Sequence, residues 1–166
     1  MSLTDLMDAP AYDPTRDNRR RNIIIGVIIG ILLLGAFAFA GFVSGHGWAF
    51  SNLGYEHRVN NFFNDLQDKD YAKAYGVYYN DPDWQQHPDK YSSYPLARFT
   101  QDWTTDSPIN GPITWHHVDK SVSAGSGTFG TGIIVAVRTN GDHKIFMYVN
   151  RADKTMTWPA PYEFKY

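Results

Sequence analysis

The chain has 166 residues, with 15 lysines and arginines against 17 aspartates and glutamates, and a formal net charge of −2 at pH 7. It has no basic excess with which to hold a phosphate backbone, so nucleic acid is excluded as an expected partner. It also has no cysteine, which excludes disulfides and a lipid-modified cysteine anchor. Its length leaves room for one globular domain besides a membrane segment.

The first pattern along the chain is an uncharged apolar run over residues 23–43, which predicts a transmembrane helix at 23–45. At about 1.5 Å per residue the run is roughly 31 Å long, the thickness of a bilayer hydrocarbon core. Glycines recur at a spacing of four in this segment, at Gly26, Gly30, Gly41 and Gly45. Such spacing lets helix backbones approach closely. We therefore expect a homodimer contact or a second membrane helix at this face, or else a plain lipid-facing anchor.

The charges around the apolar run predict its orientation. Basic residues precede it, at Arg16, Arg19, Arg20 and Arg21. In the first twenty residues after it, Arg58 is the only lysine or arginine, and Glu56 offsets its charge. We therefore expect residues 1–22 to be a disordered cytoplasmic tail, and the domain that follows a juxtamembrane linker at 46–54 to lie outside the cytoplasm. This pattern is typical of a single-pass, signal-anchored protein of the cell membrane, in contact with membrane lipid.

A cleaved signal peptide is the alternative to an anchor. Ala36-Phe37-Ala38 and Ala38-Phe39-Ala40 both offer small residues at the spacing that a signal peptidase accepts. The apolar run outlasts the usual signal-peptide core, which favours an uncleaved anchor. No Asn-x-Ser/Thr glycosylation site occurs in the chain, so a bacterial periplasm is favoured over a eukaryotic cell surface.

Three helices are predicted in the domain at 55–166. From Tyr55 onward apolar residues recur at spacings of three and four, as Val59, Phe62, Phe63 and Leu66. The spacing returns in a second helix, at Tyr71, Ala74, Tyr75 and Tyr78. Asp70 is suited to cap this second helix, and Asn80-Asp81-Pro82 ends it. Pro95 is predicted to open a third helix, with Leu96, Phe99 and Trp103 on one face.

Four strands are predicted in the last third of the chain, where the apolar period changes to two. They span 113–122, 127–139, 143–150 and 155–158. Asn140-Gly141 is a strong hairpin signal and residues 151–154 suit a second turn, so we expect an antiparallel meander and an α+β domain. In the second strand Ile133, Val135 and Val137 alternate with Ile134 and Ala136. Because neither face is cleanly polar, we expect part of the outer face to be covered by the chain or by a partner protein.

These elements resemble the NTF2-like superfamily, in particular its membrane-anchored bacterial members. The resemblance covers about residues 54–160 and is carried by the elbow Leu66-x-x-Lys69-Asp70-Tyr71-x-x-Ala74-Tyr75 and by a meander that finishes in Thr157-Trp158. It implies a cone-shaped domain whose sheet wraps the helices and leaves a pocket at the wide end. The cystatin-like domain of membrane-anchored respiratory assembly factors is an alternative resemblance. The NTF2-like fold hosts enzymes and non-catalytic modules alike, so it does not select a function.

Few residues suggest chemistry on their own. His116 and His117 are neighbours on a predicted strand and point to opposite faces, so they cannot chelate one metal ion together; one is expected inside and the other in solvent. Asp102 and Asp106 flank the end of the third helix, where a carboxylate can serve as a general base or simply be solvated. We predict no metal site, no cofactor and no catalytic residue.

Three functional hypotheses follow. The first is a non-enzymatic accessory or scaffold protein, whose domain binds a membrane-protein or envelope partner. The second is a pocket for a small apolar ligand or a lipid headgroup, lined by Tyr75, Trp103, Trp115 and Phe146. The third is an enzyme of the isomerase or dehydratase kind, with Asp102 or His116 as the ionisable group inside the cone.

Overall fold

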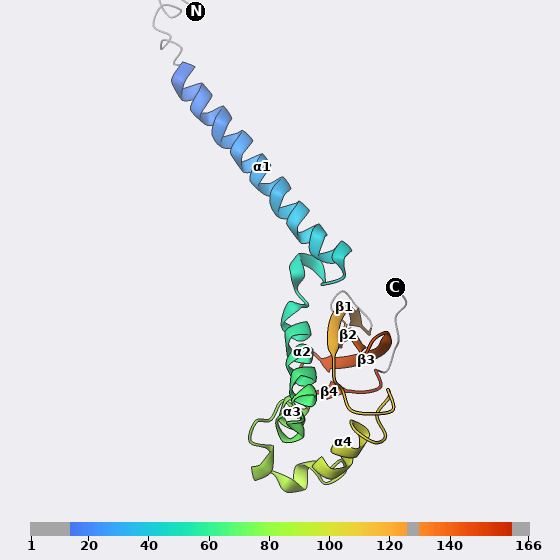
Figure 1. Ribbon diagram of the computed structural model, residues 1–166. Coiled ribbons are helices and arrows are strands. Elements are labelled where there is room, and N and C mark those ends of the chain that lie inside the picture. The colour runs from blue at the N-terminus through green and yellow to red at the C-terminus, as the bar shows by residue number, and fades with distance from the viewer. Residues whose placement is uncertain (1–13, 126–129, 161–166) are drawn as a thin grey trace, which may run out of the picture. The chain divides into compact units, whose positions relative to one another are not determined.

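The computed structural model describes residues 14–125 and 130–160, and the chain divides into two units, Met1–Ala38 and Phe39–Tyr166. The described part of the first unit belongs to helix α1, Pro14–Ser44, which continues into the second unit (Figure 1). The stretch Thr15–Ser44 is long and apolar enough to cross a membrane. Its large apolar side chains are exposed, as a lipid-facing helix requires.

Helix α1 begins earlier than the sequence suggested. Residues 14–22, predicted as part of a disordered tail, are helical, while residues 1–13 of that tail lie outside the described residues. Pro14 is the first residue of the helix, where its missing N–H costs no hydrogen bond, and Asp17 lies in the first turn, where a negative charge is favourable. The arginines that follow are good helix formers, so the helix extends through them.

The carboxyl end of α1 is closed by a Schellman motif. The N–H of Gly45 donates to the carbonyl of Phe42 (3.1 Å), and the N–H of His46 donates to the carbonyl of Gly41 (2.9 Å). Gly45 has a φ of +86°, which a residue with a Cβ adopts only with strain. The helix therefore stops at Ser44, and its last turn belongs to the second unit.

The predicted linker at 46–54 is a tightly bonded turn. Trp48–Phe50 form the short 3-10 helix η1, and the N–H of Asn52 donates to the carbonyl of His46 (3.0 Å). Helix α2, Leu53–Gln67, starts directly afterwards, two residues before the predicted position. Trp48 and Leu53 are large apolar residues with 60% and 47% of their surface exposed. Two apolar side chains are therefore exposed next to the end of α1.

The helical half of the domain follows the predicted order. Helix α3 is Tyr71–Tyr79, and the predicted cap is confirmed because the Asp70 carboxylate accepts from the N–H of Lys73 at 3.1 Å. Asn80 in the left-handed conformation ends α3. The next segment holds the 3-10 helices η2, Trp84–Gln86, and η3, Pro88–Tyr91. Helix α4 is Leu96–Asp102, with Pro95 at its N-cap instead of its first position.

The sheet is the predicted four-stranded antiparallel meander, in the order β1-β2-β3-β4. The strands are β1, His116–Ala124; β2, Gly132–Thr139; β3, His143–Asn150; and β4, Met156–Thr157. The first strand starts three residues later than predicted, because the Asn140 side chain bonds the backbone N–H groups of Thr114 and Trp115 and thus takes the place of a strand partner. Residues 127–129, predicted as the start of β2, lie outside the described residues, and β2 begins at Gly132.

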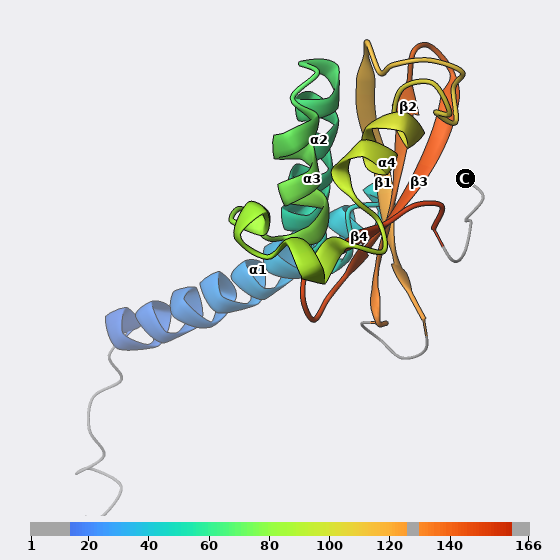
Figure 2. The same ribbon diagram turned by 90° about the horizontal axis from the view of Figure 1, so that it is seen from below.

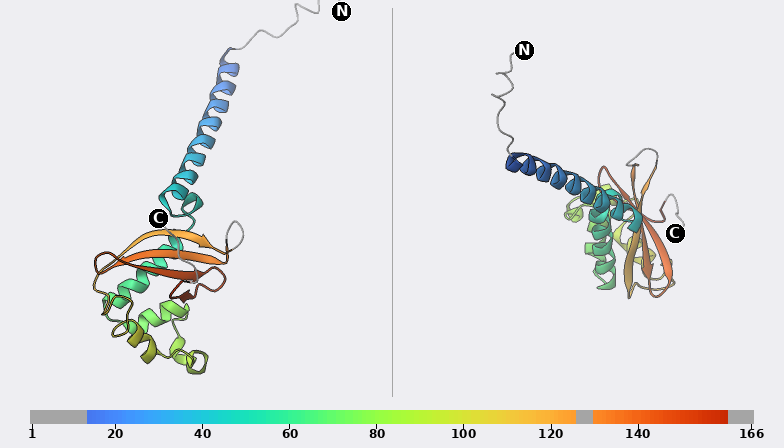
Figure 3. Two further views of the ribbon diagram at one scale, coloured as in Figure 1. Left: turned by 90° about the vertical axis from the view of Figure 1, so that its right-hand side faces the viewer. Right: turned by 90° about the horizontal axis from the view of Figure 1, so that it is seen from above.

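The core lies between the sheet and the helices. Figures 2 and 3 show α2, α3 and α4 on one face of the sheet, and Ile133, Val135 and Val137 point to that face. Aromatic rings fill the space behind them by edge-to-face contacts, such as Phe62 with Trp103 at 5.1 Å between ring centroids. The domain is therefore α+β, and Ile133, Val135 and Val137 of β2 lie on the face that the helices cover.

The first prediction concerns the closed end of α1. A Cβ at Gly41 would lie 2.5 Å from the backbone N of Phe50 and 2.7 Å from the carbonyl O of Gly47, whereas a Cβ at Gly30 would meet nothing within 4 Å. Gly41→Val is therefore expected to destabilise the second unit by about 1–3 kcal/mol through overpacking.

Gly30→Val is the matched control, since it makes the same change in the same helix. Thermal unfolding of the full chain in detergent, followed by tryptophan fluorescence, measures both variants. Equal melting temperatures for the two would show that Gly41 makes no such contact.

Candidate functional site

The contacts behind the last turn of α1 converge on Glu56 of α2, a carboxylate only 6% exposed. Its Oε2 lies 2.8 Å from Nδ1 of His46, and its Oε1 accepts from the hydroxyl of Ser121 at 2.5 Å. The N–H of Ser121 donates in turn to the carbonyl of Gly45 at 2.7 Å. We call Gly45, His46, Glu56 and Ser121 the junction cluster. It ties the end of α1, helix α2 and the edge strand β1 together.

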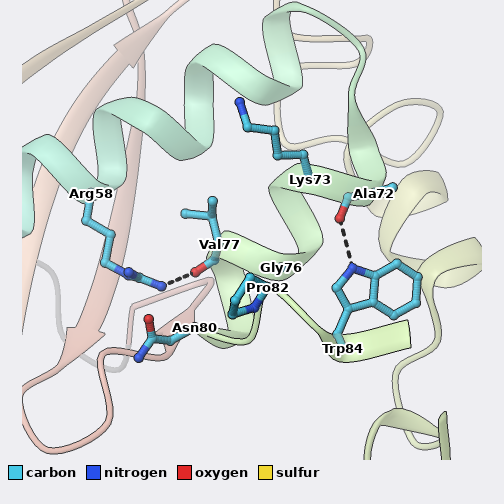
Figure 4. A pocket seen from close by; sticks show the side chains of 8 residues that line it. All are labelled: Arg58, Ala72, Lys73, Gly76, Val77, Asn80, Pro82 and Trp84. Carbon is cyan, nitrogen blue, oxygen red and sulfur yellow. Dashed lines mark hydrogen bonds between the residues drawn. The ribbon is translucent and has the colours of Figure 1, made fainter. Parts of the chain in front are cut away.

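Arg58 lies on another side of α2 from Glu56, since two residues on a helix are roughly 200° apart. Arg58 and Glu56 therefore do not form an ion pair. Instead, Nη2 of Arg58 donates to the carbonyl of Val77 at 2.6 Å (Figure 4), and Nε donates to the carbonyl of Lys154 at 3.0 Å. Within the described part of the chain no carboxylate lies within 4.0 Å of this guanidinium. Burial lowers its pKa, because part of the charge is removed from water.

Two hollows share Arg58 and Val77 as a common wall. The first, of about 390 Å³, is also lined by Gly76, Pro82 and Trp84, whose indole N–H donates to the carbonyl of Ala72 (Figure 4). The second hollow, of about 440 Å³, is completed by Gly54, Tyr55, His57, Asn61 and Lys154. We call the second one the Tyr55 hollow.

Cations surround the ring of Tyr55. The ammonium of Lys154 donates to the Tyr55 hydroxyl at 2.8 Å and to the carbonyl of Arg151 at 3.0 Å, and it lies 4.4 Å from the ring centroid. The guanidinium carbon of Arg151 lies 5.6 Å from the same centroid. The hydrogen bond from Lys154 lowers the pKa of the Tyr55 phenol, while burial opposes this effect. The arrangement presents positive charge and hydrogen-bond donors to one space.

Sequence reasoning missed the Tyr55 hollow. Tyr55 and Arg58 are three residues apart on one helix, which is a visible signal that they share a face. Lys154, however, is 99 positions from Tyr55 and sits in a turn with a φ of +63°. No periodicity in the sequence points to a contact of that range.

The four predicted pocket-lining residues lie in different environments. Tyr75 and Trp103 are fully buried members of the core, and the Tyr75 hydroxyl donates to the carbonyl of Tyr94 at 2.5 Å. Burial raises the pKa of Tyr75 to about 12. Trp115 is 44% exposed, and Phe146 lies on β3, outside the core cluster. The aromatic excess packs the interior by ring contacts instead of lining a pocket.

The predicted ionisable residues take part in structural contacts. Asp102 accepts from the Tyr94 hydroxyl (2.8 Å) and pairs with Arg98 (2.8 Å), and Asp106 accepts from Gln101 (2.9 Å). These bonds hold the end of α4 to the segment before it.

His116 is half-buried, whereas the neighbouring His117 is exposed. The ring of His116 stacks on Phe63 and lies 3.1 Å from the side-chain oxygens of Asn60 and Gln67. His117 is exposed and stacks on Trp115. Among the described residues no group of three or more His, Cys, Asp or Glu side chains is arranged to hold a metal ion.

The four glycines predicted as one helix interface divide into two pairs. Gly26 and Gly30 face open space, so they remain available for a helix partner. Gly41 packs against the η1 turn, and Gly45 is outside α1 and packs against Lys120. Gly41 and Gly45 are therefore already in contact with other residues of the chain. Arg16, Arg19, Arg20 and Arg21 are exposed in the first turns of α1.

Comparison with known proteins gave no match to a family model, to a curated protein or to a solved structure. The resemblance to the NTF2-like superfamily stays a prediction.

The second prediction concerns pH. Burial lowers the pKa of His116 below 6.5, and the nearby His117 adds to this effect. The unfolded state then binds more protons than the folded state, so this contribution to stability is present above about pH 6.5 and is lost as the pH falls through the lowered value.

His116→Gln is expected to reduce the drop in melting temperature between about pH 7.5 and pH 5, since glutamine keeps hydrogen bonding but does not titrate. His117→Gln, at the exposed neighbour, should keep the drop of the unmodified protein. Identical pH profiles for both variants would remove His116 as the cause.

Proposed function

We propose that this protein is a single-pass membrane-anchored accessory or scaffold protein, with its amino terminus in the cytoplasm and its α+β domain outside, where it binds a membrane-complex or envelope partner. The observation that carries the proposal is the junction cluster. Gly45 and His46, the first residues after α1, are already bonded to Glu56 and Ser121 of the domain. A domain joined in this way stays within a few residues of the bilayer surface instead of moving on a long tether.

The outer face of the sheet supports a protein partner. Val122, Phe146 and Tyr148 lie there, half-buried, beside the buried Ile134 and Ala136. These residues are outside the core cluster that the helices cover. Apolar and aromatic side chains with remaining exposed surface are typical of protein contact sites.

The residues that could serve an enzyme take part in structural contacts, which favours the scaffold hypothesis. Asp102 and Asp106 bond to neighbouring side chains at the end of α4, and His116 is held between a phenylalanine ring and two amide side chains. The ligand-pocket hypothesis gains one observation, the Tyr55 hollow, which is in a different place from the predicted pocket.

The third prediction tests orientation. Because the chain has no cysteine, a single introduced cysteine is unique. In intact cells a membrane-impermeant maleimide should label Ser93→Cys, at an exposed position of the domain, and should label Ser2→Cys only after lysis.

The reverse labelling pattern would overturn the orientation. If the mature chain has a smaller mass and lacks the amino-terminal segment that carries Ser2→Cys, the apolar segment is a cleaved signal peptide.

The fourth prediction tests the partner. Full-length protein extracted from its own membrane in mild detergent should co-purify with membrane proteins at fixed stoichiometry, as measured by native mass spectrometry. Val122→Arg should remove a partner that binds the outer sheet face, because the substitution places a charge in an apolar contact. Gln85→Arg, at an exposed position of η2, is the control and should keep the partner.

Recovery of the protein alone or as a homodimer would overturn the accessory role. Retention of the partner by Val122→Arg would move the contact away from the sheet. Exchange of residues 23–38 for an unrelated apolar segment then tests whether the membrane helix binds it.

A further inference from the structure

The Tyr55 hollow has an unbalanced charge. Its lining includes Arg58, Lys154 and His57, and none of its lining residues is an aspartate or glutamate. Neither Arg58 nor Lys154 has an ion-pair partner among the residues that the structure describes. By contrast, other cations of the domain are paired, such as Lys73 with Asp65 at 2.7 Å and Arg138 with Asp119 at 2.8 Å.

Protein carbonyls hold these two cations in place without neutralising them. Arg58 donates from Nε to the carbonyl of Lys154 and from Nη2 to the carbonyl of Val77, which uses two of its five N–H donors. The bonds of Lys154 run to the Tyr55 hydroxyl and the Arg151 carbonyl. Both side chains are therefore fixed before any ligand arrives, which reduces the entropy that binding would cost.

Partial burial makes an anion favourable at this place. A positive charge withdrawn from water and left without a counter-charge is costly, and a bound anion offsets that cost. Guanidinium and ammonium groups together are the donors that recognise phosphate oxygens, and a volume of about 440 Å³ is sufficient for a phosphorylated headgroup or small molecule.

We propose that the Tyr55 hollow binds a phosphate group, carried by a lipid headgroup or by a soluble molecule. Arg58 and Lys154 contact the phosphate oxygens, and the ring of Tyr55 holds the lysine in position. Tyr55 is in the first turn of α2, close in sequence to Trp48 and Leu53, the exposed apolar residues that follow α1. A headgroup is therefore the nearer source for a chain anchored as proposed above.

Two probes separate the sources, both applied to the full chain in an uncharged detergent. The first is phosphatidylglycerol against phosphatidylcholine, with bound lipid counted by native mass spectrometry. The second is inorganic phosphate, titrated while the shifts of isotope-labelled Tyr55 are followed by NMR. The lipid probe rests on the proposed membrane anchor, whereas the phosphate probe does not.

Lys154→Gln is expected to weaken binding of the responding probe about tenfold, the loss that one charge-assisted hydrogen bond predicts. Lys69→Gln is the matched control, because Lys69 is an exposed lysine with a φ of +62°, against +63° for Lys154. Since its charge is outside the hollow and screened by salt, binding should stay within about twofold of the unmodified protein.

A second pair of variants avoids the bonded lysine. Asn61→Asp introduces a carboxylate into the lining at an exposed position and should also weaken binding about tenfold. Asn64→Asp, the same change one turn along α2 and outside the lining, should have an effect of about twofold or less.

The outcomes are distinct. Selective retention of phosphatidylglycerol without a response to inorganic phosphate identifies a headgroup, and a response to inorganic phosphate identifies a site for phosphate from either source. The proposal is overturned if neither probe binds, or if Lys154→Gln and Asn61→Asp bind as well as their controls. An accessory role shown by co-purification stands in either case.

Discussion

The buried carboxylate of Glu56 is the interaction on which the second unit depends. It receives hydrogen bonds from two chain segments, at His46 and Ser121, which are far apart in sequence. A carboxylate at 6% exposure is costly unless both oxygens are bonded, so its environment specifies where the end of α1 and the edge of β1 must lie. The adjoining Schellman turn then has only one position available.

Helix α2 directs different residues to different sides. Glu56 belongs to the junction cluster, while Tyr55 and Arg58 line a cationic space in which no carboxylate takes part. Val59, Phe62 and Phe63 use a further side to fill the core. Helix α2 therefore joins the end of α1, the core and the candidate phosphate site. A substitution in its first two turns has to be interpreted against all three.

Local patterns predicted the elements well. The spacing of Phe62, Phe63 and Leu66, the cap at Asp70 and the Asn140-Gly141 hairpin depend on near neighbours, and the structure confirms each. The predicted start of β1 was wrong, because the side-chain oxygen of Asn140 accepts hydrogen bonds from the backbone N–H groups of Thr114 and Trp115. The junction cluster and the Tyr55 hollow could not be predicted, since the contacts that complete them, Glu56 with Ser121 and Tyr55 with Lys154, join residues 65 and 99 positions apart. Tyr75 and Trp103, predicted to line a pocket, belong to the core, because composition does not distinguish rings that pack together from rings that surround a space.

The sequence separation between the partners in the junction cluster also constrains when the cluster can form during synthesis. Ser121 is 76 positions after Gly45, so the carbonyl of Gly45 has no bond from β1 until that strand has been made. Contacts of such range close late in folding, because the chain between them must first be brought together. Until then one oxygen of Glu56 lacks its Ser121 partner. Once β1 pairs, both oxygens are bonded, so the junction reports whether the chain has folded through β1.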